Sequence, residues 1–211
     1  MNIGVIGAGK IGGLVGRLLV QAGHPVMFSS RHPESLQAMV TSAGPGAQLG
    51  TPEEAAAFGE VVLISVPFNA LQELGRTLAA ALAGKVVLDT GNPYPDRDGE
   101  MAREVVASGR GTGPFVAEAL PGARVVRAFN TVRHDVLGDE AHRSPPRVGI
   151  PLASDDAEAL EVASRLVRDA GFEPVVVGPL SSSVRFDVGA AVYNTGMSGP
   201  ELRQALDLPD A

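Results

Sequence analysis

Short apolar runs alternate with longer stretches of helical periodicity along most of the chain. The runs are rich in β-branched residues and predict strands at residues 2–6, 25–28, 61–65, 85–89, 124–128, 147–150 and 174–177. Apolar residues at helical spacing predict helices at residues 11–22, 34–42, 70–82 and 155–169. Strands that alternate with helices are typical of βαβ units, and we therefore expect a mostly parallel sheet.

Two inner strands, "VVLISV" and "KVVLD", are almost wholly apolar, so helices must cover both of their faces. The predicted fold class is therefore α/β, a doubly wound sheet with a small C-terminal helical extension. The polar, proline-bearing segment "LGDEAHRSPP" indicates a soft boundary at residues 136–146. The tail, residues 187–208, predicts helices on either side of a Gly-Met-Ser-Gly-Pro break.

Composition narrows the classes of partner. The formal charge of −7 and the pI near 5.1 provide no basic surface for nucleic acid. The chain has no cysteine, and its four histidines and five methionines are scattered, so we expect no disulfide, no thiolate nucleophile and no metal site. Redox chemistry would have to come from a bound cofactor.

The chain opens with "MNIGVIGAG", which lacks the basic region and cleavage site of a signal peptide. No apolar run reaches the roughly 18–20 residues that a membrane helix needs. We expect a cytoplasmic protein without a membrane segment, and the apolar tail at residues 187–208 predicts a homodimer.

A glycine-rich loop follows the first predicted strand and opens the first predicted helix. Its G-x-G-x-x-G spacing is typical of dinucleotide sites, where the first glycine makes a tight turn, the second lets the backbone approach a pyrophosphate, and the third packs helix on strand. The anion then meets free N–H groups at the helix N-terminus. The loop residues are Gly7, Ala8, Gly9, Lys10, Ile11 and Gly12.

The end of the second predicted strand indicates which dinucleotide is bound. NAD-specific sites carry an acidic residue there, but this chain has Ser29, Ser30 and Arg31. A guanidinium pairs with a 2′-phosphate that a carboxylate would repel, and hydroxyls donate to its oxygens. The sequence therefore predicts NADP as the cofactor, bound by residues 1–135.

Six motifs together resemble the F-420-dependent NADP oxidoreductase family, the NADPH:deazaflavin reductases and the broader group of NADP-binding oxidoreductases around them. They are "IGVIGAGKIG", "FSSRHPES", "LISVPFNAL", "VVLDTGNPY", "VVRAFNTV" and "AGFEPVVVGPL". The resemblance implies hydride transfer between NADPH and a flat tricyclic acceptor, a deazaflavin or a flavin. It also implies a Rossmann domain, residues 1–135, and a small C-terminal domain, residues 136–211, that completes the sheet and the acceptor site.

By this resemblance, Ser30 and Arg31 match the contacts to the 2′-phosphate, while Pro67 and Phe68 match the wall of the nicotinamide pocket. The preceding residue, Val66, is also expected to bind the cofactor. Asn92 and Asn130 each follow a strand end, at the edge where ligands bind in open α/β sheets. Deazaflavin reductases can have a histidine where Asn130 stands and a basic residue near Ser35, so the acceptor stays open.

Few side chains are candidates for acid or base chemistry. Asn130 and His134 are the candidate catalytic residues, although a loop histidine is more often a surface residue. Asp89 is interpreted as a turn residue that caps the backbone, and Tyr193 and Asn194 as packing residues of the tail.

Two alternatives to the reductase of a deazaflavin or flavin remain. One is an NADP-dependent reductase of a small carbonyl or imine, although the related enzymes carry a larger helical domain with its own proton donor. The only lysines here are Lys10 and Lys85, one in the glycine loop and one at a strand start. The other is a module that binds NADP as a sensor without turnover.

Overall fold

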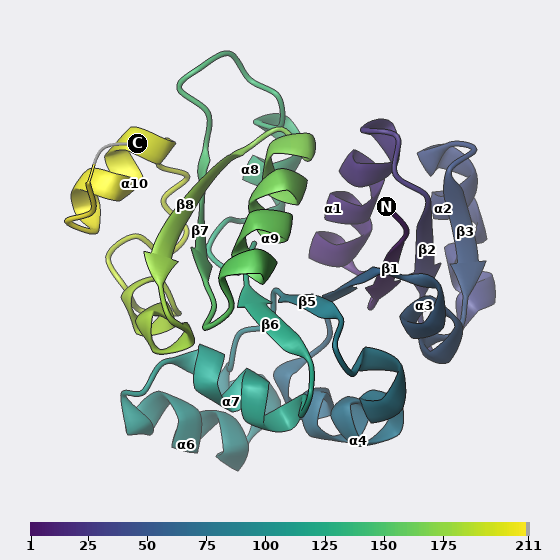
Figure 1. The fold of residues 1–211 in the computed structure, drawn as a ribbon, viewed down its shortest axis with the longest axis horizontal. Helices are drawn as coiled ribbons and strands as arrows, with labels where there is room; N and C mark the ends of the chain where they lie inside the picture. Colours follow the sequence, from purple (N-terminus) through teal and green to yellow (C-terminus); the bar gives the residue numbers. More distant parts are fainter. Residues whose placement is uncertain (210–211) are drawn as a thin grey trace.

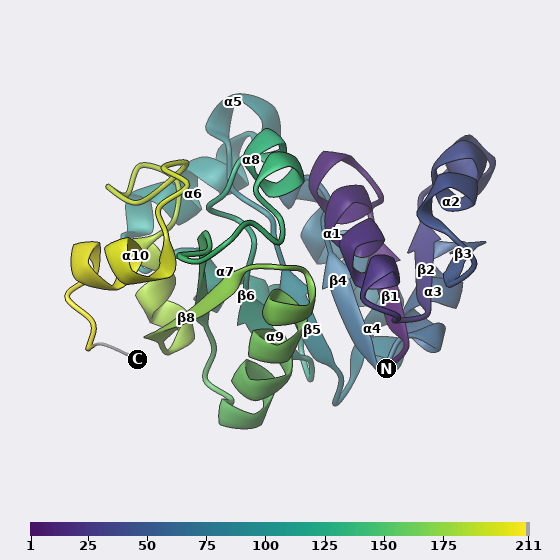
Figure 2. The same ribbon diagram turned by 90° about the horizontal axis from the view of Figure 1, so that it is seen from above.

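In the described part of the chain, eight strands form a single sheet in the order β3-β2-β1-β4-β5-β6-β7-β8 (Figures 1 and 2). The computed structural model describes residues 1–209. The strands are β1 (Ile3–Ile6), β2 (Val26–Ser29), β3 (Ala47–Gly50), β4 (Val61–Ile64), β5 (Val86–Asp89), β6 (Arg124–Arg127), β7 (Gly149–Ala153) and β8 (Glu173–Gly178). Strands β1 to β6 are parallel, whereas β7 is antiparallel to β6. The predicted class, a doubly wound and mostly parallel α/β sheet, is confirmed.

The sequence pattern missed one strand. β3 has the sequence "AQLG" and lies at the edge of the sheet beyond β2, with only Gly50 fully buried. A four-residue edge strand whose only large apolar side chain is Leu49 shows no hydrophobic periodicity that would predict a strand. Strand β1, by contrast, is buried at all four positions and was predicted.

The helices are more numerous than the sequence predicted, because one short helix precedes β4 and four more lie between β5 and β7. The α-helices are α1 (Lys10–Gln21), α2 (Gln37–Ala43), α3 (Pro52–Phe58), α4 (Leu71–Leu82), α5 (Pro95–Asp98), α6 (Glu100–Ser108), α7 (Thr112–Ala119), α8 (His134–Asp139), α9 (Ala157–Asp169) and α10 (Gly199–Ala205). Three 3₁₀ turns are η1 (Pro33–Leu36), η2 (Phe68–Ala70) and η3 (Leu180–Arg185). Local caps start some of these helices: the hydroxyl of Thr51 and the carboxylate of Glu54 form a capping box at α3.

Helices cover both faces of the sheet (Figure 2). One apolar core lies under α1, α2, α8 and α9, and it includes Val5, Leu19, Leu137 and Leu166. A second core lies under α3, α4, α6 and α7, and it includes Ile6, Leu78, Val105 and Val116. The inner strands are therefore buried on both faces, as their continuous apolar sequences required.

After β8 the chain returns through η3, which packs against α7. The prediction of a helix before the glycine break was wrong, because residues 186–194 form turns and bends. Gly189, Asn194 and Gly196 have φ angles of 91°, 59° and 66°, which no α-helix accommodates. The predicted helix after the break is confirmed as α10, which starts with a capping box at Ser198.

The apolar residues of the tail are used within the same chain. Val192, Leu202 and Leu206 are buried in a third cluster with Val175 and Val177 of β8. The homodimer, which was inferred from these tail residues, stays a prediction. In residues 1–209, none of the helices combines the length and the apolar character that crossing a bilayer demands.

Candidate functional site

The glycine loop joins β1 to α1, and its three glycines have different surroundings. Gly7 has a φ angle of 93°, and a Cβ added there would lie 2.4 Å from the carbonyl oxygen of Ser65. A Cβ on Gly12 would lie 2.3 Å from the carbonyl oxygen of Gly7. Both positions exclude a side chain because backbone already fills the space. A Cβ on Gly9 would meet nothing within 4 Å, so the space in front of this residue is open to a ligand.

The backbone N–H groups of the loop also fall into two sets, those that are bonded within the protein and those that face the open space. Those of Gly7 and Ala8 both donate to the carbonyl oxygen of Ser29 at 3.2 Å, which ties the loop to β2. Gly9 is the N-cap of α1 and provides no side-chain cap. The first N–H groups of the helix, from Lys10 onward, therefore point to the space in front of the loop, where an anion is favoured.

A cavity of about 660 Å³ opens beside the loop. Ser30, Arg31, Val66 and Pro67 line it together with residues 7–9. The side chain of Arg31 is exposed, and the Ser30 hydroxyl accepts a hydrogen bond from the N–H of His32 at 3.0 Å. The end of β2 thus presents a guanidinium and a hydroxyl to this cavity.

The other predicted residues of this side lie differently. Ser29 is fully buried, and its hydroxyl donates to the carbonyl oxygen of Val5 at 2.8 Å, so it holds β2 against β1. Phe68 is also buried and lines a separate groove between α4, α6 and α7 rather than the cavity beside the glycine loop. Two carboxylates, Glu53 and Glu73, line the cavity as well, on α3 and α4.

The structure brings the two predicted asparagines together. The side-chain nitrogen of Asn92 donates to the backbone oxygen of Asn130 at 2.8 Å. The side-chain nitrogen of Asn130 lies 3.4 Å from the side-chain oxygen of Asn92. The preceding residue, Phe129, has a φ angle of 57°, an uncommon conformation that turns the chain sharply at the end of β6. Asn92 and Asn130 are both buried at the carboxyl edge of the sheet.

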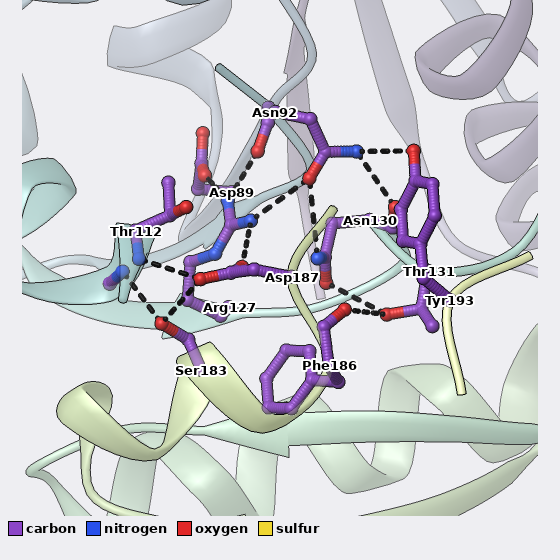
Figure 3. A network of polar contacts seen from close by, with 12 residues as sticks. Asp89, Asn92, Thr112, Arg127, Asn130, Thr131, Ser183, Phe186, Asp187 and Tyr193 are labelled. Atoms are coloured by element: carbon purple, nitrogen blue, oxygen red, sulfur yellow. Dashed lines mark hydrogen bonds and ion pairs between the residues drawn. The ribbon is translucent and has the colours of Figure 1, made fainter. Parts of the chain in front are cut away.

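A buried arginine, which the sequence analysis missed, organises this edge (Figure 3). Arg127, the last residue of β6, is completely buried and forms ion pairs with Asp89 of β5 and, at 3.2 Å, with Asp187 of the tail. It also donates to the carbonyl oxygen of Gly91 at 2.7 Å. We use the name polar network for this group, whose members are Asp89, Asn92, Thr112, Arg127, Asn130, Thr131, Ser183, Asp187 and Tyr193. A charged residue inside the otherwise apolar run "VVRAF" was the signal in the sequence.

The role expected for Asp89 was incomplete. Its carboxylate does interact with the turn after β5, but its main partner is Arg127, the residue directly opposite on β6. Burial raises the pKa of Asp89, and the Arg127 guanidinium opposes that rise. Asp89 therefore belongs to a buried ion pair that joins two neighbouring strands.

The tail enters the polar network through two side chains, Asp187 and Tyr193. Asp187 accepts hydrogen bonds from the N–H of Thr112 at 2.6 Å and from the Ser183 hydroxyl at 3.1 Å. Tyr193 receives a hydrogen bond from the side-chain nitrogen of Asn92 at 3.3 Å. Segments that are far apart in the sequence thus meet above the ends of β5 and β6, which no local pattern indicates.

His134, the other catalytic candidate, lies elsewhere. It is exposed at the start of α8 and lines a cavity of about 470 Å³ between α1 and α8, together with Gly9 and Lys10. The hydrogen bonds of Asn92 and Asn130 do not include it. Within residues 1–209, no three histidines, aspartates or glutamates are grouped so that they could hold a metal ion.

The description of the family model that matches residues 2–93 is "NADP oxidoreductase coenzyme F420-dependent". The matched segment contains the glycine loop, Ser30, Arg31, Val66 and Asn92. An F420-dependent NADP reductase of Methanocaldococcus jannaschii is 29% identical over 133 residues, which are 62% of this chain and 59% of that protein. The resemblance to this family is confirmed, and the chain is related to NADP-dependent oxidoreductases.

Two further comparisons extend over most of the chain. The metalloreductase STEAP3 of Rattus norvegicus is 29% identical over 185 residues, which are 86% of this chain and 35% of that protein. The crystal structure of the hypothetical protein SMa0349 from Sinorhizobium meliloti has a TM-score of 0.82 and 25% identity, and it covers 94% of this chain and 95% of its own. This chain therefore spans about a third of the length of STEAP3 and less than two thirds of the length of the F420-dependent NADP reductase. Its fold, by contrast, matches almost the whole of SMa0349.

Proposed function

We propose that this protein is an NADPH-dependent reductase that transfers a hydride to a flat heteroaromatic acceptor, a deazaflavin such as coenzyme F420 or a flavin. The observation that carries the proposal is the cavity beside the glycine loop, where Arg31 and Ser30 stand at the end of β2. A guanidinium at that place pairs with the 2′-phosphate of NADP, which NAD lacks.

The groups in the site fit the coenzyme. The open space at Gly9 and the N-terminus of α1 suit a pyrophosphate, and the strand order changes direction between β1 and β4, where dinucleotides bind. With the adenosine side at β2, the nicotinamide falls on the side of β4 and β5, next to Val66 and Asn92. The coenzyme would supply the hydride, and the chain would hold and orient it.

The surroundings of Asn92 and Asn130 favour an aromatic acceptor over a carbonyl. A ketone or imine needs a proton donor at its oxygen or nitrogen. The two carboxyl groups at this edge, Asp89 and Asp187, are both paired with Arg127, and burial raises the pKa of the Tyr193 hydroxyl, which makes it a weak acid. Hydride transfer between stacked rings depends mainly on positioning, which a rigid polar edge provides. The names of the two curated relatives, an F420-dependent NADP reductase and a metalloreductase, both support a reductase.

The test is NADPH oxidation, with NADH in parallel, against a deazaflavin, FMN, riboflavin and a ferric chelate with and without FMN. Turnover of NADPH with the deazaflavin or a flavin is the expected result. Reduction of the ferric chelate only when FMN is present would show that the flavin is the direct acceptor of the hydride. If NADPH binds but none of these acceptors is reduced, the proposal is wrong, and a small carbonyl or imine substrate or a sensing role would replace it.

A further inference from the structure

The chain contains two tyrosines and no tryptophan, and the two tyrosines contact each other. Tyr94 follows β5 in the loop before α5, whereas Tyr193 belongs to the turns after η3. Their hydroxyl oxygens are 2.5 Å apart. Tyr94 is on the surface and Tyr193 is half-buried, so the pair runs from the solvent to the polar network.

The hydrogen bonds around Tyr193 limit the direction in which its proton points. The side-chain nitrogen of Asn92 has only protons to offer, so the Tyr193 oxygen accepts at that contact. In the contact between the two hydroxyls, one must donate. The guanidinium of Arg97 lies 4.8 Å from the centre of the Tyr94 ring, and a cation over the ring makes that phenol the better donor. When Tyr94 donates, the Tyr193 proton is free for a ligand.

The segment that carries Tyr193 is fixed on both sides. The N–H of Asn194 donates to the carbonyl oxygen of Thr131 at 2.8 Å, and the Thr131 hydroxyl donates to the carbonyl oxygen of Phe186 at 3.2 Å. Asp187 is held by Arg127. The position of the phenol is therefore set by the loop after β6, which also carries Asn130.

The pair lies next to the place that the fold assigns to the nicotinamide. Asn92, the partner of Tyr193, follows β5, and the hydroxyl of Thr90 in the same loop donates to the hydroxyl of Ser65 after β4 at 3.0 Å. An acceptor stacked on a nicotinamide at β4 and β5 would have its edge near the hydroxyl of Tyr193.

We propose that the Tyr193 hydroxyl donates a hydrogen bond to a carbonyl oxygen or ring nitrogen at the edge of the hydride acceptor, and that Tyr94 holds it in the donating orientation. This inference rests on the proposed function and deepens it. The phenol binds and orients the acceptor and keeps its own proton. Burial raises the pKa of Tyr193, so the hydroxyl stays protonated throughout the neutral range.

The first experiment compares Tyr193→Phe and Tyr94→Phe with the unaltered protein, using whichever acceptor is turned over. Loss of one neutral hydrogen bond should raise the KM for the acceptor about 3- to 10-fold in Tyr193→Phe, with the Kd for NADPH unchanged. Tyr94→Phe should raise that KM less, because it removes only the group that orients the donor. Val176→Ala, an exposed position on β8, is the control that should change neither quantity.

The second experiment needs no turnover. In protein with carbon-13 at the tyrosine Cζ atoms, the two signals are assigned with the two variants, and oxidised FMN or deazaflavin is added to the complex with NADP. The signal of Tyr193 should shift, and the shift of Tyr94 should be smaller.

Three outcomes would overturn the inference. An acceptor KM in Tyr193→Phe equal to that of the unaltered protein would do so and would leave the proposed function standing. An equal loss of NADPH affinity and acceptor affinity would show a structural role only. Absence of turnover and of any Tyr193 shift in the unaltered protein, while NADPH still binds, would remove the proposed function together with the inference.

Discussion

The carboxyl edge of the sheet has two sides that are built by different means. On the side of β1 and β2, the space for a ligand is made by backbone: three glycines, free helix N–H groups and one exposed arginine. On the side of β5 and β6, the edge is made by buried side chains, and a single arginine joins two strands and the tail. The first side is open, whereas the buried charges of the second are paired with one another, so damage to the first should affect coenzyme binding and damage to the buried ion pairs of the second should affect the fold.

The largest effect is expected at the buried arginine. Arg127→Met would leave Asp89 and Asp187 without their cation in a buried site, and we expect a loss of about 3–5 kcal/mol in the free energy of unfolding. Urea denaturation measures it. Arg124→Met is the matched control, since Arg124 lies on the same strand but its ion pair with Asp156, at 2.6 Å, is partly exposed. Equal losses in the two variants would break the comparison between the two sides.

The next largest effect concerns coenzyme selectivity. Arg31→Ala removes a charge-assisted hydrogen bond to the 2′-phosphate and should weaken NADPH about 10- to 150-fold, while NADH binding changes little. Equilibrium titration of both coenzymes measures this, with Arg165→Ala on the exposed face of α9 as the control. An equal loss of affinity for NADPH and NADH would mean that Arg31 does not bind the 2′-phosphate.

Two glycines of one loop should then separate folding from binding. Gly12→Ala places a Cβ against backbone, and we expect a loss of about 1–3 kcal/mol in stability. Gly9→Ala should leave the stability nearly unchanged and weaken NADPH at least about tenfold, because the new methyl group occupies the space of the pyrophosphate. Melting temperatures with and without NADPH distinguish the two, and an unstable Gly9→Ala would contradict the open geometry.

The smallest effect depends on pH and involves Asp98, which receives hydrogen bonds from the N–H groups of Tyr94 and Asn69. Burial raises the pKa of Asp98, but the hydrogen bonds from Arg97 and from these N–H groups outweigh it and hold the pKa below its usual value. The resulting stability is fully present above the unfolded pKa of about 3.9 and is lost as the pH falls through the lower folded pKa.

Asp98→Asn should therefore cost about 1 kcal/mol at neutral pH, and the difference from the unaltered protein should shrink in acid. Thermal unfolding between neutral and acidic pH measures it. A difference that is constant over this range would show that the charge of Asp98 contributes nothing.

Much of the coenzyme side was predicted from the sequence because its residues are close together in the chain. The glycine loop directly follows β1, and Ser30 and Arg31 directly follow β2. The local geometry of the backbone at these two strand ends decides the roles of both motifs. Even here, packing changed two expectations: the Ser29 hydroxyl bonds to Val5, and Phe68 turns into the apolar core.

The other side was decided by the tertiary structure. Asn92 and Asn130 were predicted at one edge, because parallel strands bring their carboxyl ends together. The burial of Arg127 between two carboxylates and the contact of Tyr94 with Tyr193 were not predicted, since they join residues 60 and 99 positions apart. The sequence determined a parallel sheet and a glycine loop through local periodicity and backbone sterics, whereas the partners of buried charges depend on which distant segments the completed sheet brings together.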